Sequence, residues 1–191
     1  MDEIPINIDK KICKEDAFNV LDRIIGFINT CDNKTSIILG IIGVMLSIFF
    51  TSDSIKELQI IIISALESSK FKDYIYLFFL VLFSICLGYG IFKLISSLFA
   101  RINGLDIKEE SLDLDSKIFF RHIAKNNSYK EYKQKMTKCS QEKFVNDIIS
   151  QIYINSKICS KKYNDYNQGL IIISLGFVGF ILTLFIGSII Y

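Results

Sequence analysis

Residue types that build catalytic or metal sites are scarce in this chain of 191 residues. It has one histidine, His122, and its five cysteines form no CxxC pair, so the sequence argues against a metal site. It also lacks the GxxxxGK[ST], GxGxxG, HExxH and GxSxG motifs. We therefore predict that the protein is not an enzyme and holds no metal. We interpret His122 as a hydrogen-bonded structural residue.

An excess of charge of either sign is also missing. The formal net charge is +2, so the sequence offers no large basic patch for a nucleic acid polymer, and we expect no such partner. Tryptophan is absent and there is a single proline. Long helices can therefore form without interruption by proline.

Charge is absent, or nearly so, from three long stretches of the chain. Residues 36–50 and 166–191 carry no Asp, Glu, Lys or Arg, and residues 74–100 carry only Lys93. The whole chain is nevertheless 22% charged and 51% hydrophobic, so its charges are concentrated in 1–34 and 101–165. This segregation is typical of an integral membrane protein with substantial parts in water.

The predicted fold class is all-α: a three-span integral membrane protein whose long helices continue into a small cytoplasmic helical bundle. Apolar residues at steps of three and four over 12–31 and 145–166 predict amphipathic helices that lead into the first and third spans, with Gly169 as the only expected break. The predicted segments are a cytoplasmic N-terminal amphipathic helix (1–34), transmembrane helix 1 (35–51), an outer-side connection with an interfacial helix (52–73), transmembrane helix 2 (74–100), a cytoplasmic helical region (101–168) and transmembrane helix 3 (169–191).

Loop charge predicts the orientation. There are five Lys and Arg residues in 1–34, thirteen in 101–168 and only three in 52–73. The side with more Lys and Arg should be cytoplasmic, which places the N-terminus inside the cell and the C-terminus outside. Lys93 lies near the cytoplasmic end of its span, and we expect its ammonium group to reach the interface by snorkelling. A buried gating charge is the alternative.

Serine residues mark three predicted helix starts. Ser54 with Glu57 and Ser128 with Glu131 have the spacing of a capping box, and Ser140 precedes the long C-terminal helix. The run IFFRHI at 118–123 is too short for periodicity to distinguish a strand from a helix.

Three motifs resemble the transmembrane effectors of Pycsar antiphage systems: DNKTSIILGIIG at 32–43, FFRHIA at 119–124 and QIYINSKICSKKY at 151–163. The resemblance runs from about residue 15 to the C-terminus. The residues that match the family's first and last motifs include Asp32, Lys34, Gln151, Lys162 and Tyr163. Thr35 departs from the small apolar residue that the family has there.

The resemblance implies a membrane effector of bacterial antiphage defence. A neighbouring cyclase would make a cyclic pyrimidine mononucleotide (cUMP or cCMP) as the activating ligand. The effector would then impair membrane integrity, so that the infected cell stops growing or dies. Because three helices cannot enclose a channel, we expect a homo-oligomer in the lipid bilayer. A non-toxic membrane anchor or sensor that relays to a partner protein, or a small channel, is the alternative function.

The same five residues form our hypothetical ligand-binding set. A cyclic nucleotide needs a cation for its phosphate, an amide for its base edge and an aromatic ring for stacking. Lys34 or Lys162 would meet the phosphate, Gln151 the pyrimidine edge and Tyr163 the ring. The competing interpretation is that Asp32 pairs with Lys162 across the bundle and fixes the packing of the helices.

Overall fold

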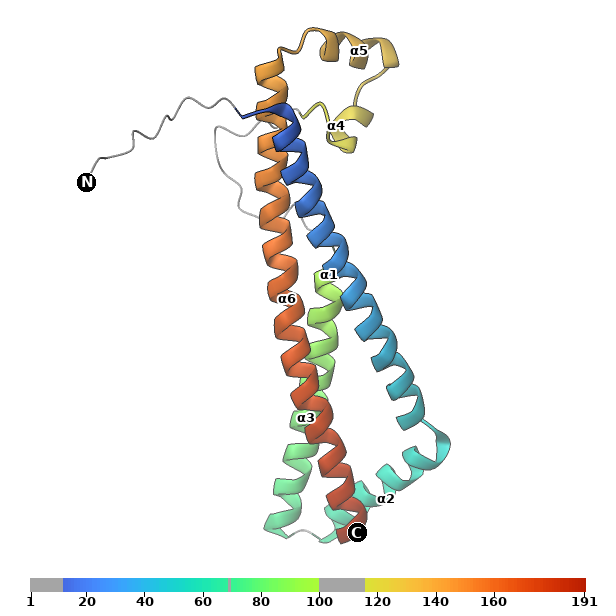
Figure 1. Cartoon of the computed structure of the whole chain (residues 1–191). Coiled ribbons are helices and arrows are strands. Elements are labelled where there is room, and N and C mark those ends of the chain that lie inside the picture. The colour runs from blue at the N-terminus through green and yellow to red at the C-terminus, as the bar shows by residue number, and fades with distance from the viewer. Residues whose placement is uncertain (1–11, 69, 100–115) are drawn as a thin grey trace, which may run out of the picture. The chain divides into compact units, whose positions relative to one another are not determined.

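The computed structural model describes residues 12–68, 70–99 and 116–191, and within these ranges every regular element is a helix (Figure 1). The helices are α1 (Lys14–Phe49), α2 (Ser52–Ser68), α3 (Phe71–Leu98), α4 (Phe120–Ala124), α5 (Tyr129–Thr137) and α6 (Gln141–Ile190). Three of them, α1, α3 and α6, are long and apolar enough to cross a membrane. The predicted all-α class with three such helices is confirmed.

Two helices continue from charged sequence into apolar sequence without a break. α1 has 36 residues and α6 has 50, so α6 is about 75 Å long at 1.5 Å per residue. The break expected at Gly169 was wrong, because the helix passes straight through this residue. Gly169 lies instead where α6 approaches α3: a Cβ atom there would be 3.0 Å from the backbone nitrogen of Leu94.

Two of the three predicted serine caps are confirmed. Ser128 Oγ accepts a hydrogen bond from the Glu131 amide at 3.2 Å, and Ser140 Oγ accepts one from the Lys143 amide at 3.3 Å. The cap expected at Ser54 was wrong, because α2 begins at Ser52 and the Ser54 hydroxyl lies 2.9 Å from that of Thr51. The ambiguous run at 118–123 leads into the short helix α4.

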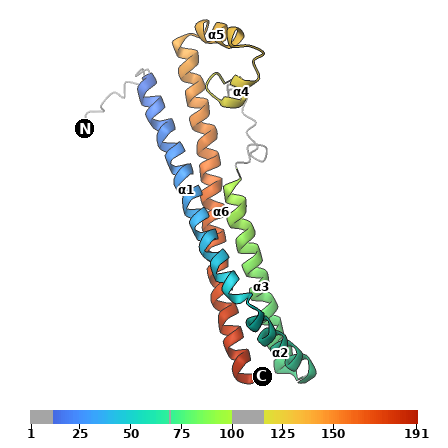
Figure 2. The same ribbon diagram turned by 90° about the vertical axis from the view of Figure 1, so that its right-hand side faces the viewer.

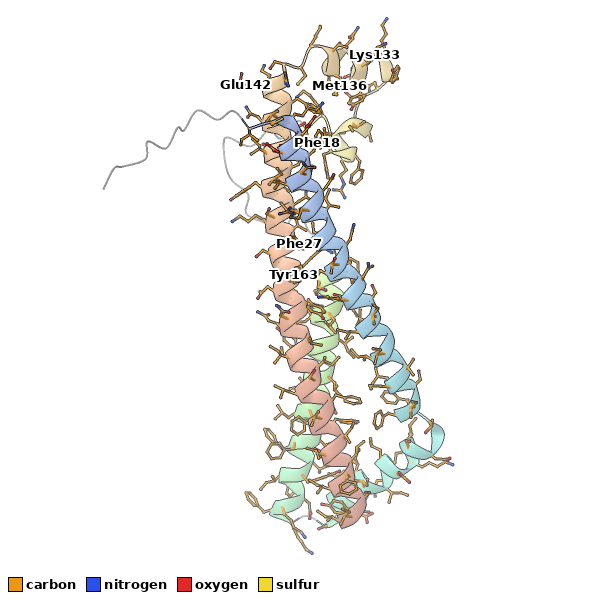
Figure 3. The ribbon with its side chains drawn as sticks, in the orientation of Figure 1. Phe18, Phe27, Lys133, Met136, Glu142 and Tyr163 are labelled. Atoms are coloured by element: carbon orange, nitrogen blue, oxygen red, sulfur yellow. The ribbon has the colours of Figure 1, made fainter. Side chains whose placement is uncertain are left out.

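The chain divides into two compact units. Unit 1 comprises residues 1–28 and 101–159, and unit 2 comprises residues 29–100 and 160–191. In the described part of unit 1, Ala17, Leu21 and Ile148 form a buried core. Phe18 (labelled in Figure 3) packs on this core with its ring centroid 6.1 Å from that of Phe144. That unit 1 lies in the cytoplasm stays a prediction.

The segment that precedes α4 is held to α6 and to α5 by hydrogen bonds between its backbone and their side chains. The Lys117 amide donates to the carboxylate of Asp147 at 2.7 Å, and the Tyr132 hydroxyl donates to the Lys117 carbonyl at 3.0 Å. The Ser116 amide donates to Nδ1 of His122 at 3.2 Å. His122 therefore helps to hold this turn in place.

In unit 2, α3 and α6 lie side by side in both views (Figures 1 and 2). Leu87, Leu94 and Ile173 form the buried core where they meet. Glycine allows the close approach, since a Cβ atom added at Gly90 would lie 2.8 Å from the backbone nitrogen of Ile173. Such contacts between helix backbones are typical of helices that pack in a membrane.

The apolar part of α1 has far fewer contacts. Ile38, Leu39 and Ile42 reach the core of unit 2, whereas Ile37, Val44 and Ile48 are 63%, 63% and 64% exposed. Small residues recur at spacing four on this helix, Ser36 with Gly40 and Gly43 with Ser47, as they do on faces where membrane helices pack closely. A Cβ atom at Gly40 or Gly43 would nevertheless meet nothing within 4 Å. The small-residue face of α1 is therefore not used within the described part of the protomer.

Candidate functional site

A partly buried ion pair joins the three long helices in unit 2. Lys162 on α6 is only 4% exposed, and its ammonium group donates to the carboxylate of Asp32 on α1 at 2.6 Å. It also donates to the carbonyl oxygen of Leu98 at 3.1 Å. Because Leu98 ends α3, its carbonyl has no partner within the helix. One ammonium group therefore satisfies a carboxylate on α1 and the last turn of α3.

A pair of hydroxyl groups lies next to this ion pair along the helices. The oxygen atoms of Thr35 and Ser97 are 3.1 Å apart, and both side chains are buried. The Thr35 hydroxyl is also 2.9 Å from the Cys31 carbonyl, and that of Ser97 is 2.8 Å from the Leu94 carbonyl. The polar residue at 35 thus has a partner on α3.

A second ion pair joins α3 to α6. Lys93 donates to the carboxylate of Asp165 at 3.0 Å, and these side chains are 21% and 14% exposed. That Lys93 reaches the interface by snorkelling stays a prediction; the structure adds that a carboxylate on the neighbouring helix pairs with its ammonium group. A partly buried charge is costly unless it is paired and hydrogen-bonded in this way.

Together these groups form a charge-balanced cluster, with two ammonium groups and two carboxylates, that ties α1, α3 and α6 to one another. Each helix contributes two polar residues three or four positions apart, which puts them on one face. They are Asp32 and Thr35 on α1, Lys93 and Ser97 on α3, and Lys162 and Asp165 on α6. This matched spacing is the sequence signal for Thr35, Ser97, Lys93 and Asp165, which our ligand-binding set did not include.

The structure places the five candidate ligand residues in different environments. It brings Asp32 and Lys162 together as the ion pair just described. Lys34 is exposed, and because it lies two positions from Asp32 it does not share the face of that residue. Tyr163 (labelled on α6 in Figure 3) is half-buried. Gln151 belongs to unit 1, where its side chain is buried.

The positions of Lys162 and Lys34 determine how easily a phosphate can reach each of them. The Lys162 ammonium already contacts a carboxylate and a carbonyl in a buried position, so a phosphate reaches it only by displacing one of them. The exposed ammonium of Lys34 needs no such rearrangement. The cluster is thus suited to holding helices in one arrangement, and an anion that competes for Lys162 would change that arrangement.

The fold and the cluster define a class of protein: a helical protein with three helices able to cross a membrane, tied together by partly buried ion pairs. Comparison with known proteins identifies its family within this class. Residues 16–189 match the profile of the Pycsar effector protein domain, PycTM, and the chain belongs to this family.

Two curated relatives cover most of the chain. The Pycsar effector protein GmPycTM of Gulbenkiania mobilis is 34% identical over 165 residues, which is 82% of this chain and 84% of the relative. The Pycsar effector protein EcPycTM of Escherichia coli is 26% identical over 151 residues, or 76% of this chain and 75% of the relative. No solved structure matches the chain. Membership of the family implies a role as an effector in antiphage defence.

Proposed function

We propose that a cyclic pyrimidine mononucleotide, cUMP or cCMP, activates this effector, which then impairs the integrity of the bacterial inner membrane. The infected cell would stop growing or die before phage matures. The match of residues 16–189 to the Pycsar effector domain supports this proposal most strongly. The three apolar helices supply the contact with lipid that such an effector requires.

Within this proposal the candidate residues divide into two groups. Asp32 and Lys162 hold the helices of unit 2 together. Lys34 and Tyr163, both in unit 2, offer an accessible cation for the single phosphate charge and a ring for stacking. Gln151 lies in unit 1, about 18 Å before Tyr163 along α6, so its amide would meet the pyrimidine edge only of a nucleotide that is bound separately in unit 1. Burial of Gln151 means that the base must enter the fold to reach it.

The activation step is a population shift between two helix arrangements. α1 and α6 each carry residues of both units in one unbroken helix, so a displacement of either helix in unit 1 is passed to its apolar part in unit 2. A ligand shifts such an equilibrium only if it binds one arrangement more tightly. Several protomers would have to assemble to breach the membrane, because the three helices of one protomer do not enclose a pore.

Nucleotide binding by single-site variants tests the assignment of the ligand residues. Removing a charge-assisted hydrogen bond costs about 1.5–3 kcal/mol, so Lys34→Ala should weaken cUMP or cCMP binding by about tenfold or more. Gln151→Ala should weaken it by about fivefold, since its amide is neutral. Isothermal titration of the full chain in detergent measures both, and Lys161→Ala, which removes an exposed lysine on α6, is the matched control.

These measurements distinguish residues that bind the nucleotide from residues that transmit its signal. If the Lys34 and Gln151 variants keep wild-type affinity but lose toxicity in cells that also express the cyclase, these residues transmit the signal and do not bind it. If the wild-type chain binds neither nucleotide, the proposed activation is wrong. If it binds but growth continues, the non-toxic anchor or sensor becomes the better account.

A further inference from the structure

Helix α1 carries a stripe of exposed apolar side chains along one face. It consists of Val20, Phe27, Ile41 and Ile48, and their exposed fractions run from 46% at Val20 to 64% at Ile48 (Phe27 is labelled in Figure 3). These residues are separated by multiples of seven, so the stripe follows the helix for about 42 Å, with the slow drift that a left-handed coiled coil removes. Lys34, which is also exposed, occupies the remaining position of this series.

The stripe extends through both the charged and the apolar part of α1. Residues 14–34 include seven charged side chains, whereas residues 36–50 include none. A helix of 36 residues is about 54 Å long and the hydrocarbon layer is about 30 Å thick, so α1 crosses this layer with about 24 Å left outside it. Val20 and Phe27 belong to the charged part, and Ile41 and Ile48 belong to the apolar part.

Another side of α1 is already used within the protomer. Ala17 and Leu21 pack on Ile148, and the Thr35 hydroxyl lies 3.1 Å from that of Ser97. The rest of α1 has little cover: of its most apolar 18 residues 6% are buried, against 17% in α3 and 28% in α6. The stripe is therefore available for contact with something outside the protomer.

The course of the stripe restricts what can cover it. Lipid covers the apolar part of α1, but it does not reach Val20 and Phe27 in the charged part. A soluble partner covers only the charged part. An occupant of the whole stripe must itself pass from water into lipid at the same level as α1. A second copy of this chain meets that requirement, because its own α1 changes from charged to apolar after the same residue, Lys34.

We propose that two copies of the chain pair through this stripe, with their α1 helices parallel and in register. Residues at the same position then meet, so Phe27 packs on Phe27 of the second copy and Ile48 on its Ile48. The same register brings two Lys34 ammonium groups together. A lysine at such a position fixes the register of paired helices and lowers their stability, so Lys34 limits the affinity. The pairing does not rest on the proposed nucleotide response.

Disulfide cross-linking of the full chain in lipid vesicles tests the proposal. Phe27→Cys and Ile48→Cys each place a thiol on the stripe, and mild oxidation should link two copies at either position. Ile25→Cys and Ser47→Cys are the matched controls, because these exposed positions lie on other sides of α1 within two residues of the stripe. A disulfide needs its two Cα atoms within about 7 Å, so the yield of dimer should exceed that of the control about tenfold at both positions. The unsubstituted chain gives the background from its native cysteines.

The affinity between copies gives a second test with opposite signs at two positions. It is measured by energy transfer between labelled copies in vesicles. Lys34→Leu removes the repulsion between ammonium groups and should raise the affinity about tenfold. Phe27→Glu replaces an apolar contact with two like charges and should lower it about tenfold or more. Lys161→Leu replaces an exposed lysine on α6 and should change nothing.

Four results would overturn the proposal. The first is a yield of dimer at position 27 or 48 no greater than that of its control. The second is cross-linking at 48 without cross-linking at 27, which would restrict the contact to the lipid. The third is an adduct whose mass is not twice that of the chain, which would make another protein the occupant. The last is an unchanged affinity in Lys34→Leu, since the two ammonium groups would then not meet.

Discussion

Replacing Lys162 with methionine should destabilise the helices of unit 2 by about 2–3 kcal/mol and abolish the growth arrest. The change leaves the carboxylate of Asp32 and the terminal carbonyl of α3 without their ammonium partner. The cost is below that of a fully buried pair because Asp32 is 35% exposed and gains some solvation. The buried thiol of Cys31, next to Asp32 in the chain, reports the change as faster labelling by a maleimide.

A double-mutant cycle distinguishes the energy of this ion pair from the packing energy that is lost with the Lys162 side chain. Asp32→Asn combined with Lys162→Met should cost less than the sum of the two single changes, with a coupling of about 1–3 kcal/mol. Lys161→Met removes an exposed lysine from the same turn and should be neutral. Strictly additive costs would show that the contact between Asp32 and Lys162 does not hold the helices together.

Gly90→Ala should have a similarly large effect, although it adds a single methyl group. The new Cβ atom would lie 2.8 Å from both the backbone nitrogen and the Cβ atom of Ile173, so α3 and α6 must separate. Overpacking of this kind costs about 1–3 kcal/mol, and contact with backbone leaves little room to relax, so we expect the upper part of that range. Thermal unfolding in detergent, followed by circular dichroism, measures it.

Gly88→Ala is the matched control for this substitution. It makes the same chemical change two positions away on α3, where an added Cβ atom would meet nothing within 4 Å. Alanine is a better helix former than glycine by about 1 kcal/mol, so this variant should be neutral or slightly more stable. Equal destabilisation by both variants would contradict the close approach of α3 and α6.

The helices themselves followed from the sequence because their signals are local. Charge-free runs identified the three apolar helices, and serine residues at 128 and 140 identified two helix starts. One of the errors came from a tertiary contact. Gly169 looked like a break, but its missing side chain serves the packing of α6 against Leu94. The partner of Lys93 was not predictable, because nothing local reveals that Asp165 faces it.

The candidate site was predictable only in part for the same reason. The pairing of Asp32 with Lys162 was an alternative at the outset, since both residues lie close to apolar helices and have opposite charge. The contribution of the Leu98 carbonyl was not predictable, because it depends on where α3 ends. Periodicity within each helix could have added Thr35 and Ser97 to the candidate site, but only the three-dimensional structure shows that their hydroxyl groups lie next to each other.

The central claim is that a cyclic pyrimidine nucleotide makes this chain breach a membrane. The most direct measurement is dye release from sealed vesicles that contain the purified full-length chain and an entrapped fluorophore. Addition of cUMP or cCMP should release the dye from these vesicles, while cAMP should not, and Lys162→Met should abolish the response. Release that is the same with and without nucleotide, or no greater than from vesicles without protein, would contradict the account.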